Sequence, residues 1–226
     1  MASQVTEEYL ETIYNLWMER EPVIAARLAE KFGVARATVS ETLKRLVAEG
    51  FVELGPNRAI ELTAKGRELT EQILRRHRLA ERLLFDVLGM DWVSAHEQAH
   101  ALEHWISAEV EARISSLLGN PRTCPHGNPI PGNASSGTEF LREQSAFRLA
   151  DAGLGQTVRV VLISEVVEDE SAVLRQLSDT GIHPRAELTL LEPDPEEAVV
   201  FQTAGRRCAV QRDLAGKIWV AESDLS

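Results

Sequence analysis

The sequence lacks the features of secreted, disulfide-rich and membrane-spanning proteins. It has only two cysteines among 226 residues, Cys124 and Cys208, too few for a disulfide framework. It has no run of about 18 apolar residues, which excludes a membrane-spanning helix. Residues 1–10 have neither a basic start nor an apolar stretch, so we expect no secretory signal. These absences predict a cytoplasmic protein without a membrane partner.

Positive charge is scarce overall, and it is unevenly distributed. The formal net charge is −11, which argues against a uniformly basic nucleic-acid coat. Residues 23–48 nevertheless carry five basic and two acidic side chains, a local charge of +3. Residues 150–226 carry seven basic and 14 acidic side chains, a charge of −7. A mildly basic segment on an acidic chain predicts a division of labour between regions.

Three amphipathic segments and a hairpin make up the first part of the chain. Apolar residues at helical spacing predict helices over 6–18, over 22–32 and from about Arg36 to an end at Gly50, with Gly33 closing the second of them. Two short extended runs, 51–54 and 59–62, flank Gly55-Pro56-Asn57 and predict a β-hairpin. This is the order of a winged helix-turn-helix domain.

The third helix has the composition of a DNA-recognition helix. In this motif its N-terminal residues face base edges in the major groove, while basic side chains nearby contact phosphates. We expect Leu43 and Val47 to face inward. The local charge of +3 would neutralise few phosphates, which favours a dimer. The predicted DNA-binding residues, including one at the tip of the wing, are Arg27, Arg36, Thr38, Ser40, Lys44, Arg45 and Arg58.

The rest of the chain changes from helical to extended patterns. Long helical segments are predicted over 63–88 and 91–118, followed by a proline- and glycine-rich linker over 119–155. Beyond it, β-branched runs predict the strands of a small barrel, with a helix near 171–177. The predicted strands are 158–163, 188–191, 199–201 and 218–220.

Histidines and carboxylates gather on the two long helical segments. Four of the six histidines lie between positions 77 and 104. His77 and Glu81 are four residues apart on the first helix. A stripe of imidazoles and carboxylates on facing helices is what a divalent cation needs, because it brings several ligands within coordination distance. The stripe on the second helix contains His96, His100, Glu103 and His104.

Two other functional classes compete with a metal-sensing regulator. His96-Glu97-Gln98-Ala99-His100 matches the H-E-x-x-H pattern, in which two histidines bind zinc and the glutamate is the base of a metallohydrolase. Position 103 is Glu rather than the Gly of the extended pattern, and most of the other candidate ligands would remain unused. We therefore expect no enzyme and no small-molecule substrate. The other alternative is a non-regulatory interaction module in the C-terminal third.

Several segments resemble one family, the metal-dependent repressors typified by the diphtheria toxin repressor and the manganese transport regulator. The resemblance rests on residues 8–14, 38–40, 77–84, 102–104 and 127–132. It implies a mainly α fold with a small β part. The implied domains are a winged helix-turn-helix over 1–63, a helical metal-binding and dimerisation domain over 64–132, a linker over 133–155, and an SH3-like (FeoA-like) small β-barrel over 156–226.

The resemblance also implies two metal positions. The first uses His77, Glu81 and His96, with Glu170 reaching in from the SH3-like domain. A glutamine ligand of the iron-sensing branch is replaced here by Val173. Cys124 and His126 in the proline-rich segment are interpreted as an incidental pair. The second position uses Glu8, His100, Glu103 and His104.

At this second position the sequence departs from the iron-sensing branch. That branch has methionine and cysteine where this chain has Glu8 and His100. The harder ligands favour Mn²⁺ as the cofactor, with Fe²⁺ as the alternative, although other divalent metals can substitute in vitro. The resemblance implies a homodimer that binds palindromic double-stranded DNA operators and represses metal-uptake genes. We expect a cation held between Glu8 and the dimerisation domain to set the spacing of paired recognition helices.

Overall fold

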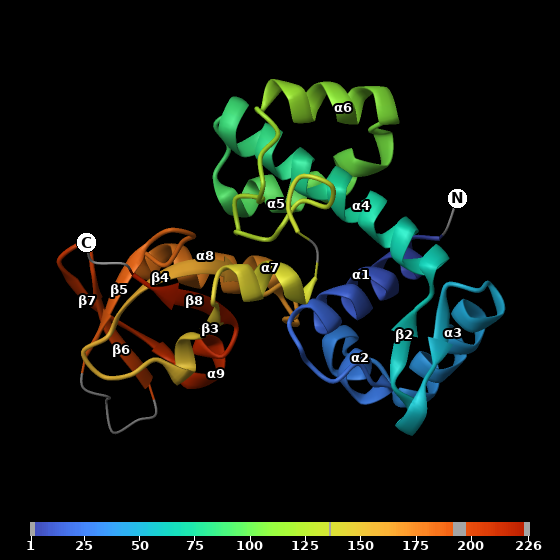
Figure 1. Ribbon diagram of the computed structural model, residues 1–226, viewed down its shortest axis with the longest axis horizontal. Coiled ribbons are helices and arrows are strands. Elements are labelled where there is room, and N and C mark those ends of the chain that lie inside the picture. The colour runs from blue at the N-terminus through green and yellow to red at the C-terminus, as the bar shows by residue number, and fades with distance from the viewer. Residues whose placement is uncertain (1–2, 136, 192–197, 224–226) are drawn as a thin grey trace.

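The computed structural model describes residues 3–135, 137–191 and 198–223. Three lobes meet near the centre of the molecule (Figure 1). The N-terminal helices and hairpin form one lobe, helices α4 to α6 form the second, and the C-terminal sheet with its helices forms the third. No helix in these residues is long and apolar enough to cross a bilayer.

The N-terminal lobe has the predicted winged helix-turn-helix order. Helix α2 begins at Ala25 rather than at Pro22, and Val47 of α3 is 41% exposed rather than facing inward. Gly33 ends α2 with φ +61° and leads into α3. The strands β1 and β2 pair antiparallel around the wing turn. The elements are α1 (Gln4–Met18), α2 (Ala25–Phe32), α3 (Arg36–Ala48), β1 (Val52–Leu54) and β2 (Ile60–Leu62).

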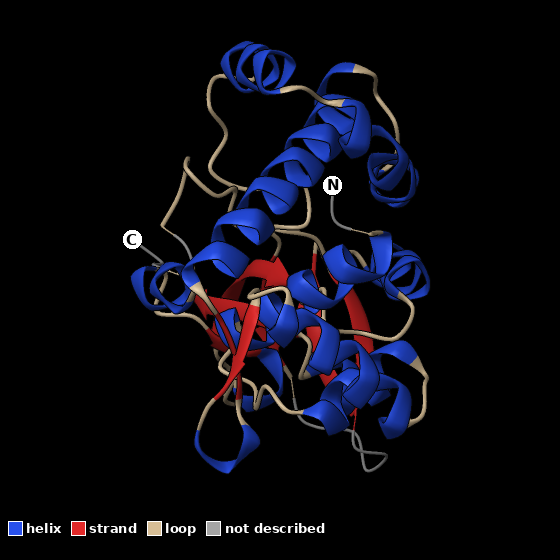
Figure 2. Ribbon diagram, turned by 90° about the vertical axis from the view of Figure 1, so that its right-hand side faces the viewer, coloured by secondary structure: helices blue, strands red, loops and turns tan. Residues whose placement is uncertain are grey.

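The second lobe contains α4 (Ala64–Arg82), α5 (Trp92–Leu102) and α6 (Ala108–Leu117). The prediction of one helix over 91–118 was wrong, because the chain breaks between α5 and α6. Ile106 adopts an extended conformation, and the Ser107 hydroxyl caps α6 by accepting a hydrogen bond from the Val110 N–H. Helix α4 crosses the middle of the molecule and reaches toward the N-terminal lobe (Figure 2).

The C-terminal lobe is a six-stranded antiparallel sheet in the order β3-β8-β4-β5-β6-β7. Part of the segment expected as linker belongs to it, since α7 and β3 lie within 133–155 and β3 pairs with β8. Strand β7 was not predicted, because its exposed arginines hide the apolar alternation. The elements are α7 (Thr138–Glu143), β3 (Phe147–Arg148), β4 (Thr157–Ile163), α8 (Glu170–Thr180), β5 (Glu187–Leu190), β6 (Ala198–Thr203), β7 (Arg206–Gln211), α9 (Arg212–Ala215) and β8 (Ile218–Glu222).

The lobes share hydrophobic contacts across their borders. Val166, from the loop after β4, is 7% exposed and packs in the core of the N-terminal lobe with Leu10, Leu28 and other residues. Trp92 at the start of α5 packs in the core of the C-terminal lobe. The three lobes are therefore held in one arrangement by packing as well as by polar contacts.

Candidate metal centre and DNA-binding face

Three histidine rings form the centre of the candidate metal site. His77 lies on α4, and His96 and His100 lie one turn apart on α5, which packs against α4. The centroid of the His100 ring is 4.5 Å from that of His77 and 4.9 Å from that of His96. One ligand atom from each ring lies within 4.8 Å of the others, so the three can share a cation.

Two buried glutamates hold these rings in place. The carboxylate of Glu103 lies 2.6 Å from His77 Nδ1, and Glu81 Oε1 lies 3.2 Å from His77 Nε2 and 2.8 Å from His96 Nδ1. Burial by itself lowers the pKa of His77, but Glu81 and Glu103 outweigh burial and raise this pKa well above its usual value. His126 and His77 likewise hold the pKa of Glu81 well below its usual range in spite of burial.

His126 also belongs to the cluster, although the sequence analysis interpreted it with Cys124 as an incidental pair. Its Nδ1 lies 3.1 Å from Glu81 Oε1 and 3.8 Å from Cys124 Sγ. With Glu81 and His96 it forms a second group whose ligand atoms lie within 4.8 Å of one another. Burial raises the pKa of the Cys124 thiol well above its usual value, and the Glu81 carboxylate adds to this.

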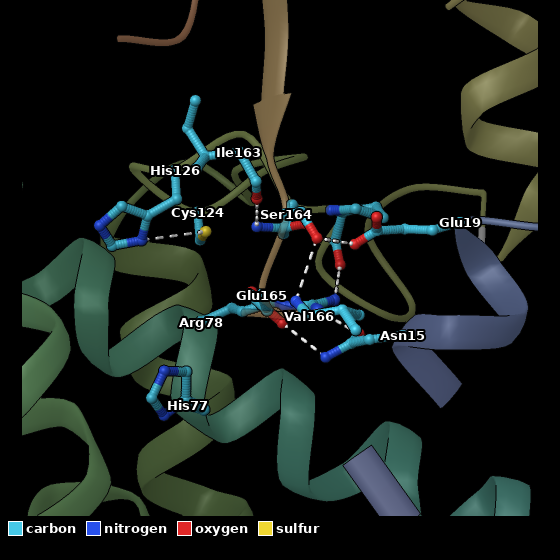
Figure 3. A network of polar contacts seen from close by, with 12 residues as sticks. Asn15, Glu19, His77, Arg78, Cys124, His126, Ile163, Ser164, Glu165 and Val166 are labelled. Atoms are coloured by element: carbon cyan, nitrogen blue, oxygen red, sulfur yellow. Dashed lines mark hydrogen bonds and ion pairs between the residues drawn. The ribbon is translucent and has the colours of Figure 1, made fainter. Parts of the chain in front are cut away.

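A tight turn places His126 beside the end of β4 (Figure 3). Gly127 has φ +89°, and a Cβ there would lie 2.1 Å from Val161 O of β4. The backbone N–H of Ile163 donates to His126 O at 2.9 Å, and Asn128 Nδ2 donates to Ile163 O at 3.0 Å. Glycine at 127 therefore lets this segment lie against β4 and present His126 to Glu81.

The environment of one carboxylate oxygen of Glu81 indicates that a cation fits between Glu81, His96 and His126. Glu81 Oε2 is buried and has no hydrogen-bond partner among the described residues. Leaving a buried carboxylate oxygen unpaired costs free energy, and a cation between Glu81, His96 and His126 would remove that cost. The surrounding donors are imidazole nitrogens and carboxylate oxygens, which suit first-row divalent metals. The residues present therefore fit a divalent cation.

Glu170, at the start of α8, connects the C-terminal lobe to this cluster. Its Oε2 lies 3.0 Å from His96 Nε2, and its Oε1 lies 2.7 Å from Lys31 Nζ. Burial alone would raise the pKa of Glu170, but hydrogen bonds and charges from His96 and Lys31 lower it to about 2. Glu170 therefore lies beside the histidine cluster, whereas Val173 packs against the core of its own lobe.

Helix α1 supplies carboxylates from the N-terminal lobe. Glu8 and Glu11 line a cavity of about 280 Å³ together with His77, His96 and His100. Burial is the largest cause that raises the pKa of Glu11, to about 8. The cavity therefore joins α1 to the histidine cluster, as the resemblance implied for Glu8.

The second expected ligand group is not assembled as one set. The side chain of His104 is 46% exposed. Its Nδ1 lies 3.6 Å from the carboxylate of Glu7, whereas the expected partner was Glu8. Its Nε2 lies 3.7 Å from Glu103. Glu8 and His100 line the cavity instead, so the structure divides these expected ligands between the cavity and its edge.

Glu7, Glu11 and His126 were not among the predicted metal ligands. The signal for the first two was helical spacing, because Glu7 and Glu11 are four residues apart and flank Glu8 on α1. For His126 the signal was the Cys-x-His spacing in the proline-rich segment. Nothing in the sequence alone placed that segment against α4 and α5.

The predicted DNA-binding face is exposed on α3 and the wing. The side chains of α3 and the wing tip that we predicted to contact DNA are exposed, namely Arg36, Thr38, Ser40, Lys44, Arg45 and Arg58. Arg27 differs, since its guanidinium donates to Glu21 at 2.9 Å and to Glu30 at 3.0 Å. Arg27 is therefore the one predicted DNA contact whose charge is already paired within the described part of the chain.

The metallohydrolase alternative does not fit the site. Glu97, the base in that interpretation, is exposed and its carboxylate lies 3.2 Å from Arg175 on α8. His96 and His100 do lie in the histidine cluster. The glutamate between them pairs with Arg175 instead, so the base of the motif does not face the candidate metal position.

Family profiles match nearly the whole chain. Residues 1–60 match "Iron dependent repressor, N-terminal DNA binding domain", residues 63–132 match "Iron dependent repressor, metal binding and dimerisation domain", and residues 147–222 match "FeoA domain".

Individual relatives and solved structures are also similar to this chain over most of their length. The iron-dependent repressor IdeR of Mycobacterium leprae is 39% identical over 205 residues, covering 88% of this chain and 89% of IdeR. The diphtheria toxin repressor of Corynebacterium efficiens is 36% identical over 222 residues, covering 97% and 96%. A manganese-dependent transcriptional repressor in complex with manganese is 31% identical, with a TM-score of 0.77 over 96% of this chain and 100% of that one.

Proposed function

Because the chain belongs to the iron-dependent repressor family and is therefore a metal-dependent, DNA-binding transcriptional repressor rather than an enzyme, we propose that it responds to Mn²⁺ and, as a homodimer, represses metal-uptake genes from palindromic operators. The observation that carries this proposal is the cluster of histidines and glutamates beside α1 of the DNA-binding domain, in which His77, His96 and Glu81 are buried. Fe²⁺ is the alternative activator.

The choice of Mn²⁺ rests on the chemistry of the ligands. Glu8 gives the cavity a carboxylate and His100 gives it an imidazole, and none of the described residues that line it carries sulfur. Hard donors suit Mn²⁺ and Fe²⁺, whereas thiolates and thioethers favour softer ions. Cys124 lies at the opposite end of the cluster, beside His126. Among the similar proteins, IdeR is named for iron and others for manganese, so the family alone does not choose between them.

Two overlapping ligand groups support the assignment. His77, His96 and His100, joined by Glu8, would hold one cation at the cavity. Glu81, His96 and His126 would hold a cation on the other side, while Glu170 faces the other ring nitrogen of His96 and lines the cavity. When bound, the cation supplies a positive charge shared by carboxylates of separate domains. His96 belongs to both groups, which predicts that loading of the two positions is coupled.

Exposed apolar side chains on the second lobe support a homodimer. Trp105 is 85% exposed, Leu88 is 63% exposed and Leu117 is 69% exposed, with Phe85, Val87 and Val110 also exposed. Clusters of exposed apolar residues mark interaction surfaces in soluble proteins. We propose that part of this surface pairs with the same surface of a second copy. Leu88→Glu should then give a monomer in sedimentation velocity, and an unchanged dimer would contradict this surface.

The proposed switch couples α1 to the second lobe. Glu8 and Glu11 lie on α1, whereas the histidines with which they line the cavity lie on α4 and α5. Shared ligation would fix the angle of the DNA-binding domain relative to the dimer axis. Two recognition helices must lie about 34–36 Å apart to enter successive major grooves, so a fixed angle selects the competent spacing.

The test is metal-by-metal DNA binding. A duplex selected from a random library in the presence of Mn²⁺ is titrated with protein by fluorescence anisotropy, with Mn²⁺, Fe²⁺ under anaerobic conditions, Zn²⁺ or chelator. We expect affinity to rise at least about tenfold with Mn²⁺ and to return to its low value with chelator. Equal affinity with and without chelator would overturn metal control, and a response to Fe²⁺ alone would favour the iron alternative.

A further inference from the structure

Lys31 makes an unusual set of contacts for a surface lysine. It lies near the end of α2, two residues before the Gly33 turn that leads into α3. Its ammonium group donates to Glu170 Oε1 at 2.7 Å, to Glu165 O at 3.1 Å and to Val167 O. An ammonium has three N–H donors, so residues 165–170 of the C-terminal lobe satisfy all of them. This segment thus forms an oxygen-lined cradle for a cation.

The cradle is held firmly by the other two lobes. Glu165 Oε2 accepts from Arg78 of α4 and from Asn15 of α1, both at 2.8 Å, as Figure 3 shows. The Ser164 hydroxyl donates to Glu19 at 2.7 Å. The position of the cradle is therefore set independently of Lys31, and removing the lysine should leave the loop in place.

The same carboxylate serves the metal cluster. Glu170 uses Oε1 for Lys31 and Oε2 for His96, so both of its oxygens are engaged. The cavity beside it is lined by Glu8, Glu11, Glu165, Glu168 and Glu170, and Lys31 is the one lysine or arginine among the described lining residues. An ammonium beside a divalent cation is repelled by it, and each would lower the other's affinity for the shared carboxylate.

We propose that Lys31 is a built-in competitor for the divalent cation at Glu170, which sets the metal concentration needed for binding and ties α2 to the C-terminal lobe when Glu170 is not ligating metal. The inference rests on the proposed function, since it requires a cation at the His96 and Glu170 end of the cluster. Lys31 acts through Glu170 and is a positioning residue rather than a ligand.

Metal affinity is the first test. Mn²⁺ is titrated calorimetrically into the full chain, Lys31→Met and Lys31→Arg. We expect Lys31→Met to bind Mn²⁺ at least about fivefold more tightly, because the cation no longer competes with an ammonium for Glu170, and Lys31→Arg to stay within about twofold of the wild type. Lys65→Met is the matched control, since Lys65 also donates to a backbone carbonyl, Glu49 O at 2.8 Å, but lies outside the cavity.

A double-mutant cycle separates competition from a general structural effect. In a Glu170→Gln background the contested carboxylate is absent, so Lys31→Met should no longer tighten Mn²⁺ binding. The second readout is amine reactivity measured by pulse labelling and mass spectrometry. Lys31 has a side chain that is 15% exposed, and its reactivity should rise severalfold on addition of Mn²⁺ while that of Lys65 stays constant.

The outcomes distinguish this inference from the function on which it rests. A wild-type chain that binds no Mn²⁺ would overturn the proposed function, and this inference with it. Normal Mn²⁺ binding in the wild type, with unchanged or weaker binding in Lys31→Met, would overturn the competitor role alone. An effect of Lys31→Met that persists in Glu170→Gln would also overturn it, because the competition would not pass through Glu170.

Discussion

The DNA-facing surface and the metal cluster are built in opposite ways. On α3 and the wing, side chains such as Arg36, Arg45 and Arg58 come from one continuous segment and are exposed. In the metal cluster, His77, His96 and His126 come from three separate segments and are buried. The predicted DNA-binding surface therefore needs only a local helix and turn to bring its side chains together, whereas the candidate metal site needs the packing of separate segments.

The largest expected effect is on Mn²⁺ binding by the buried cluster. His77 touches both Glu81 and Glu103 and lines the cavity, so His77→Ala should weaken Mn²⁺ binding by at least about 100-fold. DNA affinity in chelator should stay as in the wild type, because the DNA-facing surface is untouched. His183→Ala, an exposed histidine outside the cluster, is the control. If calorimetry gave His77→Ala the Mn²⁺ affinity of the wild type, the histidine cluster would not be the metal-binding site.

The next largest effect should be confined to DNA binding by the exposed side chains of α3. Arg36→Ala or Arg45→Ala should weaken Mn²⁺-dependent binding to the selected duplex by about 1–3 kcal/mol, because each removes a charge from the predicted recognition helix. Calorimetric Mn²⁺ affinity should not change. Arg113→Ala is the control, since Arg113 is exposed on α6 and paired with Glu109. If the α3 variants bind DNA as well as Arg113→Ala does, a different face contacts DNA.

Acidity should weaken Mn²⁺ binding, because protons compete with the cation for the buried cluster. Interactions with Glu170 and Glu81 outweigh burial and raise the pKa of His96 to about 10, so this imidazole is protonated at neutral pH. Metal ligation needs the neutral form and must displace the proton. Mn²⁺ affinity should therefore rise with pH between 6 and 8, by up to about tenfold per unit for each proton displaced.

Calorimetry in two buffers of different ionisation enthalpy would count the protons released on Mn²⁺ binding. The expected count is at least one proton per cation at pH 7. An affinity that is flat across this range, with no proton release, would mean that the imidazoles are neutral before metal binds.

The smallest effect is expected at Arg27. Its guanidinium is held by Glu21 and Glu30, so Arg27→Ala should change duplex affinity by less than about twofold and the free energy of unfolding by about 0.2–1 kcal/mol. Anisotropy and urea denaturation measure the two quantities. A loss of affinity as large as that of Arg36→Ala would show that Arg27 leaves its partners to contact DNA.

These two regions also differ in how far the sequence could predict them. Helical spacing and the Gly33 turn located α2 and α3, and the same spacing placed His77 beside Glu81. Periodicity could not show that α5 ends before Ser107, because apolar residues continue in register across the break. It could not place His126 beside Glu81 either, because that contact joins a loop to α4. Glu7 and Glu11 had a signal in the helical spacing of α1, whereas the place of His126 depends on how separate segments pack.

The burial of Val166 indicates that the C-terminal domain contributes to the stability of the winged-helix domain. Its side chain completes the interior of the winged-helix domain, and burying a valine is worth about 1.5–3 kcal/mol. A chain truncated before β4 would leave a gap there that only water or a rearranged neighbour could fill. The repressor's DNA-binding unit is therefore finished by a residue encoded more than a hundred positions downstream, so it should reach its full stability only after the last domain has docked.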